Sequence, residues 1–185
     1  HLHILDPRYE FLQQLTTGRF EVYPLEVSED HRRLFALATL EDPTQQQLFR
    51  IDLEDGSMTR LTTLEGVYDS PAVSDDGTRA LVRFEDFGLL PELHAVNAAT
   101  SSWTPVTSSH PEEAHKLTRA KPTYFSYENR HGQTIHGHLF KPADWTPEDK
   151  RPLLVYVYGG PLGRRNQLSR GSYSSSAYFF AWYMA

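Results

Sequence analysis

The sequence predicts a mixed fold, in which the C-terminal blades of a β-propeller are followed by the first strands of an α/β domain. Strand-like segments and Asp/Gly turns recur every 45–46 residues through the first 108 residues, which is typical of one four-stranded propeller blade per repeat. Later in the chain, an apolar run at residues 153–158 ends in Gly159, Gly160 and Pro161. A covered strand that ends in such a turn is typical of an α/β sheet.

The repeat is visible as pairs of similar segments that keep the same spacing. The first copy is incomplete, and two full copies follow it. The matching pairs, at shifts of 45 or 46 residues, are Val27 with Val73, residues 48–52 with 93–97, 61–62 with 106–107, 2–6 with 48–52, and 15–16 with 61–62. We therefore expect two complete blades and one partial blade.

Within a repeat, the residues alternate as a sheet strand requires. Ala80, Val82 and Phe84 share one face of their strand, and Leu81 and Arg83 share the other, because successive side chains point to opposite faces. One face is then free to pack on a neighbouring blade. A generic β-sandwich is the alternative that uses the same alternation.

The turns between these strands have a defined chemistry. Residues 74–77 read Ser-Asp-Asp-Gly and residues 54–57 read Glu-Asp-Gly-Ser. Aspartate side chains bond to their own backbone, and Gly77 tolerates a positive φ, so both segments predict tight hairpin turns. Propellers close with roughly four to eight blades. Two and a half blades cannot close a ring, so we expect earlier blades to be missing from this chain.

Composition limits the functional classes. The chain has 39% hydrophobic and 23% charged residues and a formal net charge of −6. These values are ordinary for a folded domain, and without a basic stripe they argue against nucleic acid as a partner. No apolar run reaches the roughly 18 residues of a membrane-spanning helix. The absence of cysteine excludes disulfides and thiol catalysis, but does not separate a bacterial cytoplasm from a periplasm.

The 45–46 residue periodicity ends after the repeats, and the sequence pattern changes. We divide the chain into a partial propeller at residues 1–108, a polar connector at 109–122 and the start of a second domain at 123–185. Residues 123–127 and 134–140 predict an antiparallel hairpin around a turn at 129–132. A proline-containing connection then leads to the apolar strand. Serines near residue 174 predict the start of a terminal helix.

Two sequence segments resemble segments of a known protein family. Residues 132–142, Gly-Gln-Thr-Ile-His-Gly-His-Leu-Phe-Lys-Pro, and residues 152–161, Pro-Leu-Leu-Val-Tyr-Val-Tyr-Gly-Gly-Pro, are similar to the opening of the α/β-hydrolase domain in the prolyl oligopeptidase family of serine peptidases. In that family a propeller precedes this domain. Tyr158 resembles the dipeptidyl-peptidase IV branch, because acylaminoacyl-peptidase-like relatives commonly have His at that place.

The resemblance implies a catalytic role for Tyr158. A phenol with a pKa of about 10 stays protonated at neutral pH, so its hydroxyl can donate to the oxyanion of a tetrahedral intermediate. Gly159, Gly160 and Pro161 form the expected active-site turn beside it. The alternative is that Tyr158 only fills space at the end of the strand.

Other candidate residues are weaker. A hydrolase of this class needs a G-x-S-x-G elbow followed by an acid and a His, and residues 171–175 lack the final glycine, so we expect the nucleophile, acid and base to lie outside this chain. His136 and His138 share a strand face without a third ligand, so no metal is expected. Residues 112–113 are an acidic pair in the connector, where the family's substrate-binding pair does not lie. Residues 164–165 are arginines that we expect to be solvated.

The functional expectation is a part of a serine exopeptidase that releases N-terminal dipeptides, with an Xaa-Pro or Xaa-Ala preference. The resemblance implies peptide substrates and no cofactor, and it allows a homodimer of the complete protein. We expect no nucleic acid and no membrane span. The alternatives are a catalytically inactive binding protein on the same scaffold, or an acylaminoacyl-peptidase or esterase. The chain by itself is expected to be inactive.

Overall fold

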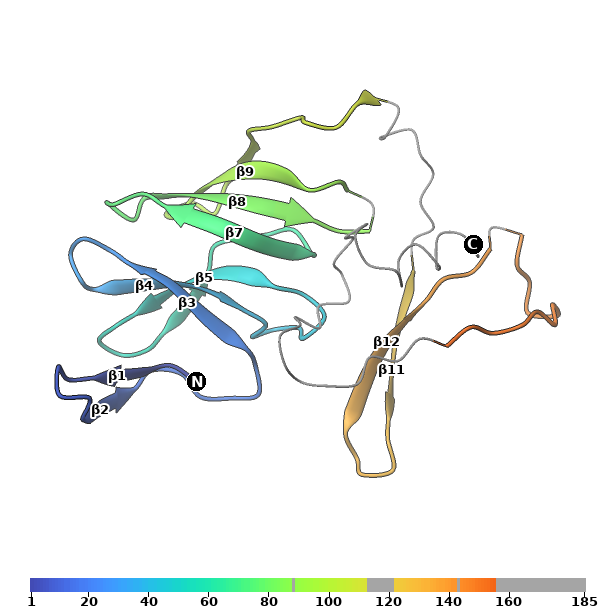
Figure 1. Cartoon of the computed structure of the whole chain (residues 1–185), viewed down its shortest axis with the longest axis horizontal. Coiled ribbons are helices and arrows are strands. Elements are labelled where there is room, and N and C mark those ends of the chain that lie inside the picture. Colours follow the sequence, from blue (N-terminus) through green and yellow to red (C-terminus); the bar gives the residue numbers. More distant parts are fainter. Residues whose placement is uncertain (88, 113–121, 143, 156–185) are drawn as a thin grey trace.

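The computed structural model describes residues 1–87, 89–112, 122–142 and 144–155. Their strands form separate antiparallel sheets, which follow one another along the chain (Figure 1). In this part of the chain, no helix is both long enough and apolar enough to cross a membrane.

The first half of the chain is a hairpin followed by two four-stranded sheets. The hairpin consists of β1 (His3–Leu5) and β2 (Phe11–Gln14). The first sheet consists of β3 (Val22–Val27), β4 (Arg33–Ala38), β5 (Gln47–Asp52) and β6 (Met58–Arg60). The second sheet consists of β7 (Val67–Val73), β8 (Arg79–Glu85), β9 (Glu92–Asn97) and β10 (Trp103–Pro105). In both sheets, strands that are consecutive in the chain are neighbours, as expected for a propeller blade.

The two sheets place the repeated residues at equivalent positions. Val27 is the last residue of β3 and pairs with Leu34, while Val73 is the last residue of β7 and pairs with Ala80. In each sheet, the pairing of the first two strands is interrupted by an irregularity a few residues before this valine. The prediction that Val27 and Val73 occupy equivalent positions is therefore confirmed.

The turns after these valines are also equivalent. The hydroxyls of Ser28 and Ser74 each donate to the aspartate two residues later at 2.6 Å. Each hydroxyl also accepts from the backbone N–H of the arginine five residues later, at 3.1 Å and 3.0 Å. His31 and Gly77 then take positive φ angles of 54° and 66°. The same closed turn is built twice, with glycine at the left-handed position only in the second copy.

In all three copies, a threonine links the third and fourth strands of the repeat by a hydrogen bond. Its hydroxyl accepts a hydrogen bond from the backbone N–H of the leucine fourteen residues earlier. We call each such pair a threonine latch. The three latches are Thr16 with Leu2 at 2.8 Å, Thr62 with Leu48 at 3.1 Å, and Thr107 with Leu93 at 2.9 Å.

The core lies between the first and second sheets. Ala80, Val82 and Phe84 are 3%, 0% and 2% exposed and belong to one cluster with Phe35 and Leu37 of β4. Burial of large apolar side chains contributes about 1.5–3 kcal/mol each. The predicted alternation is confirmed, because the intervening residues of β8 on its other face are only partly buried up to position 83.

The second hairpin also agrees with the sequence. It consists of β11 (Thr123–Glu128) and β12 (Thr134–Leu139), which pair in register around a turn where Gly132 has a φ of +70°. The ring of Phe125 covers Gly137, where an added Cβ would lie only 2.5 Å from the ring. A side chain at position 137 would therefore have to displace the Phe125 ring, which is 47% exposed.

One expectation is not met. Residues 153–155, the start of the predicted buried strand, have no regular structure, and their side chains are 61–73% exposed. A buried parallel strand needs a neighbour on each side, and no described strand pairs with these residues. The rest of the run, from residue 156, and the predicted helix near residue 174 lie outside the described residues.

Candidate functional site at the hairpin-facing ends of the sheets

The loop that follows β8 in the second sheet contacts the β11–β12 hairpin and the residue after it. β4 and β8 are equivalent strands, so the loops that follow them lie at the same end, toward which β8 points in Figure 1. Phe87, in the loop after β8, is 7% exposed. Its ring centroid lies 5.6 Å from that of His138 and 5.3 Å from that of Phe140. Ligand sites occur preferentially where two structural units meet, which makes this end the candidate site.

An arginine between two buried carboxylates lies on the second sheet near this end. Arg83 donates from Nε and Nη2 to the two oxygens of Asp69, at 2.7 Å and 2.5 Å, and its Nη2 lies 3.7 Å from Oε1 of Glu85. Asp69 and Glu85 are 5% and 1% exposed. The hydrogen bonds that Arg83 donates to Asp69 raise the pKa of Arg83, so it remains a cation.

This cluster has capacity for one more oxygen ligand. The bidentate pair uses one edge of the guanidinium, and Nη1 of Arg83 has no hydrogen-bond partner among the described residues. The Arg83 side chain is 36% exposed. A carbonyl or carboxylate oxygen can therefore bind to its free edge, while Asp69 holds the group in place.

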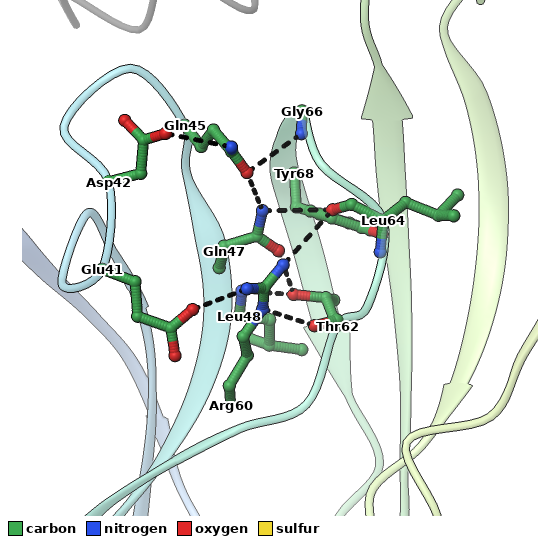
Figure 2. Close-up of polar contacts among 10 residues, drawn as sticks. All are labelled: Glu41, Asp42, Gln45, Gln47, Leu48, Arg60, Thr62, Leu64, Gly66 and Tyr68. Carbon is green, nitrogen blue, oxygen red and sulfur yellow. Dashed lines mark hydrogen bonds and ion pairs between the residues drawn. The ribbon is translucent and has the colours of Figure 1, made fainter.

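A second polar network holds the loop between β4 and β5 (Figure 2). Arg60 donates to Glu41 Oε2 and to the Thr62 carbonyl, both at 2.6 Å. Gln47 donates to the Leu64 carbonyl at 3.1 Å and accepts from the Thr62 hydroxyl at 2.6 Å. The side-chain donors and acceptors named here are hydrogen-bonded to other protein groups. We assign the network to the structure of the loop rather than to a ligand.

Gln46 connects the first sheet to the second. Its Nε2 donates to the Tyr68 carbonyl at 2.6 Å, and its backbone N–H donates to the Gly66 carbonyl at 3.1 Å. The Tyr68 hydroxyl accepts from the Leu64 N–H at 3.2 Å, and burial raises the pKa of Tyr68 to about 12. These bonds fix the spacing of the two sheets on which the candidate site depends.

Glu92 ties the start of the connector to β9. It accepts hydrogen bonds from the Thr107 hydroxyl, from the Ser109 N–H at 2.7 Å and from the His110 N–H at 3.3 Å. Burial raises the pKa of Glu92, but these hydrogen bonds outweigh that effect, and the pKa is lowered. Serine, histidine and a carboxylate meet here, but the Ser109 hydroxyl donates to Glu92 and not to His110. The arrangement is therefore a structural tie and not a catalytic triad.

The structure places only some of the predicted site residues. Tyr158, Gly159, Gly160 and Pro161 lie outside the described residues, as do the arginines at residues 164–165. No group of metal-binding side chains occurs within the described ranges, and His138 there contacts aromatic rings.

Two features of this end were not predictable from the sequence. The Arg83 cluster joins residues fourteen positions apart, and its only signal is the presence of charges inside apolar strands. The contact of Phe87 with His138 joins residues of different sheets, and no pattern of spacing indicates it. Both arise from tertiary packing.

Comparisons with known proteins agree with this architecture. Residues 1–91 match the family model of the dipeptidyl peptidase IV N-terminal region. A probable dipeptidyl-aminopeptidase B of Aspergillus terreus is 30% identical over 156 residues, which cover 80% of this chain and 17% of that protein. The chain belongs to the dipeptidyl peptidase IV family. Human dipeptidyl peptidase 8 is 25% identical over 178 residues, covering 89% of the chain and 19% of that protein.

The fold agrees with the family. A crystal structure of Porphyromonas gingivalis dipeptidyl peptidase 4 superposes with a TM-score of 0.79 at 17% identity, covering 98% of this chain and 26% of that one. The antiparallel sheets described above are consistent with a propeller region in this dipeptidyl peptidase IV relative. The chain spans about a fifth of the length of the curated relatives that it matches.

Proposed function

We propose that this chain is part of a serine exopeptidase that releases dipeptides from the N-terminus of peptides, with a preference for Xaa-Pro or Xaa-Ala. Residues 1–108 are its partial propeller, 109–122 its connector and 123–185 the start of its α/β-hydrolase domain. Tyr158 donates its hydroxyl to the oxyanion, and Gly159, Gly160 and Pro161 form the turn beside it. The nucleophile, acid and base come from elsewhere in the complete protein.

The extent of one alignment carries this proposal. The match to human dipeptidyl peptidase 8 covers 89% of the 185 residues, so it leaves at most about 20 residues at either end unmatched. It therefore includes Tyr158 and the turn that follows it, as well as both sheets and the β11–β12 hairpin. The similarity thus extends past the N-terminal region that the family model matches.

The test uses the full-length gene product. We expect it to release Xaa-Pro dipeptides from a peptide with a free N-terminus but not from the same peptide after N-acetylation, with mass spectrometry as the readout. Hydrolysis of acyl esters alone would instead identify an esterase. A folded protein that hydrolyses neither substrate would identify an inactive binding protein.

A further inference from the structure

The contact between the second sheet and the β11–β12 hairpin is made by aromatic rings around one histidine. The His138 ring lies 5.6 Å from Phe87, 5.2 Å from Phe140 and 6.4 Å from Tyr124, measured between ring centroids. Phe87 comes from the second sheet, whereas the other three residues come from the hairpin or directly follow it. One histidine therefore lies at the junction of the two units.

The His138 ring is held as a neutral group. Its Nδ1 is buried and has no hydrogen-bond partner among the described residues. A protonated imidazole carries a donor on each nitrogen, and a buried donor without an acceptor is costly. Burial accordingly lowers the pKa of His138. The closed junction is compatible with neutral His138 and opposes its protonation.

Titratable groups come near His138 from both hairpin strands and from the segment that carries Phe87. Tyr124 pairs with it from β11, and His136 shares its face of β12. Glu85, at the end of β8, and Asp86 directly precede Phe87. Glu85 forms an ion pair with Arg83. A protonated Nδ1 would need an acceptor, and the closed junction pairs this atom with none of the described residues. Water can supply the acceptor once the rings separate.

We propose that the junction of Phe87, His138 and Phe140 is a pH-sensitive contact. It holds the β11–β12 hairpin against the second sheet when His138 is neutral and releases it when His138 takes up a proton. The direction follows from linkage. A base that is kept neutral in the closed state favours that state above its ordinary pKa of about 6.5 and loses this contribution as the pH falls below it. Release is therefore expected in the mildly acidic range.

The test measures the distance between the two units. The chain has no cysteine, so Ala99→Cys and Arg130→Cys give unique spin-label sites on the second sheet and on the hairpin turn. We expect one narrow distance distribution at about pH 8 and a broad one at about pH 5. The NMR titration of the His138 ring should have the same midpoint as this change.

Three variants make the test specific. His138→Phe and His138→Leu cannot titrate, and each variant that keeps the wild-type far-UV spectrum should keep the narrow distribution at both pH values. His136→Gln, two residues earlier on the same strand, is the matched control and should open like the wild type. An unchanged wild-type distribution after His138 is protonated would overturn the proposal, as would acid opening that persists in a folded His138 variant.

Discussion

Gly77 shows how a single residue sets the geometry of a turn. Its φ of +66° lies in the left-handed region, and an added Cβ would come within 3.3 Å of the Phe35 ring. The equivalent residue of the first sheet, His31, adopts φ +54° with its side chain exposed. The turn therefore tolerates a side chain when it points to solvent, but the packing beneath Gly77 leaves little room for one.

We expect Gly77→Ala to lower the free energy of unfolding by about 1–2 kcal/mol, because alanine is strained in the left-handed region. Urea unfolding followed by circular dichroism measures this change. His31→Ala is the control, since that position already holds a side chain, and it should stay within about 0.5 kcal/mol. Equal effects of the two substitutions would show that neither the conformation of Gly77 nor its contact with Phe35 matters.

At the scale of the element, the threonine latches keep the fourth strand of each repeat in place. Thr62 is 4% exposed, accepts from the Leu48 N–H and donates to Gln47 Oε1. A valine at this position keeps the volume but leaves both partners without a hydrogen bond. The loss in free energy of unfolding should therefore depend on whether the hydroxyl is present and not on the size of the side chain.

Thr62→Val should lower the free energy of unfolding by about 2 kcal/mol, because each buried group left unpaired costs roughly 1–3 kcal/mol. Thr62→Ser keeps the hydroxyl and should cost less, although it loses a methyl group. Thermal or urea unfolding of both variants gives the comparison. A larger loss of stability in Thr62→Ser than in Thr62→Val would contradict the role of the hydroxyl in the threonine latch.

The tie between Glu92 and the connector gives a pH dependence. The folded-state pKa of Glu92 is lowered, so its contribution to stability is present above the unfolded value of about 4.3 and is lost as the pH falls through and below that value. Glu92→Gln should cost on the order of 1–2 kcal/mol near neutral pH, and the difference from the wild type should shrink at about pH 3. Urea unfolding at both pH values tests this, and a difference that stays constant with pH would contradict it.

At the scale of the whole molecule, the sequence predicted what is local and periodic. The 45–46 residue period located the strands and the Ser74 turn, because each recurs at a fixed distance along the chain. It also matched Thr16, Thr62 and Thr107 to one another, but the hydrogen bonds of these threonines were found only in the structure. The hairpin was recognisable from its alternation and from Gly132. The contact of Arg83 with Asp69 and that of Phe87 with His138 were not predictable, since they depend on how strands and sheets are packed. Residues 153–155 read as a buried strand because they are apolar, yet they have no strand neighbour in the described structure.

The most direct test of the central claim is the activity of the full-length gene product with Tyr158→Phe. The substitution removes one hydroxyl and almost no volume, so folding should survive while an oxyanion donor is lost. We expect kcat for an Xaa-Pro substrate to fall by about 10²–10³ with little change in KM, because the hydrogen bond strengthens mainly in the transition state. A kcat within about twofold of the wild type, with chemistry rate-limiting, would show that Tyr158 is only a packing residue and would contradict the proposed site.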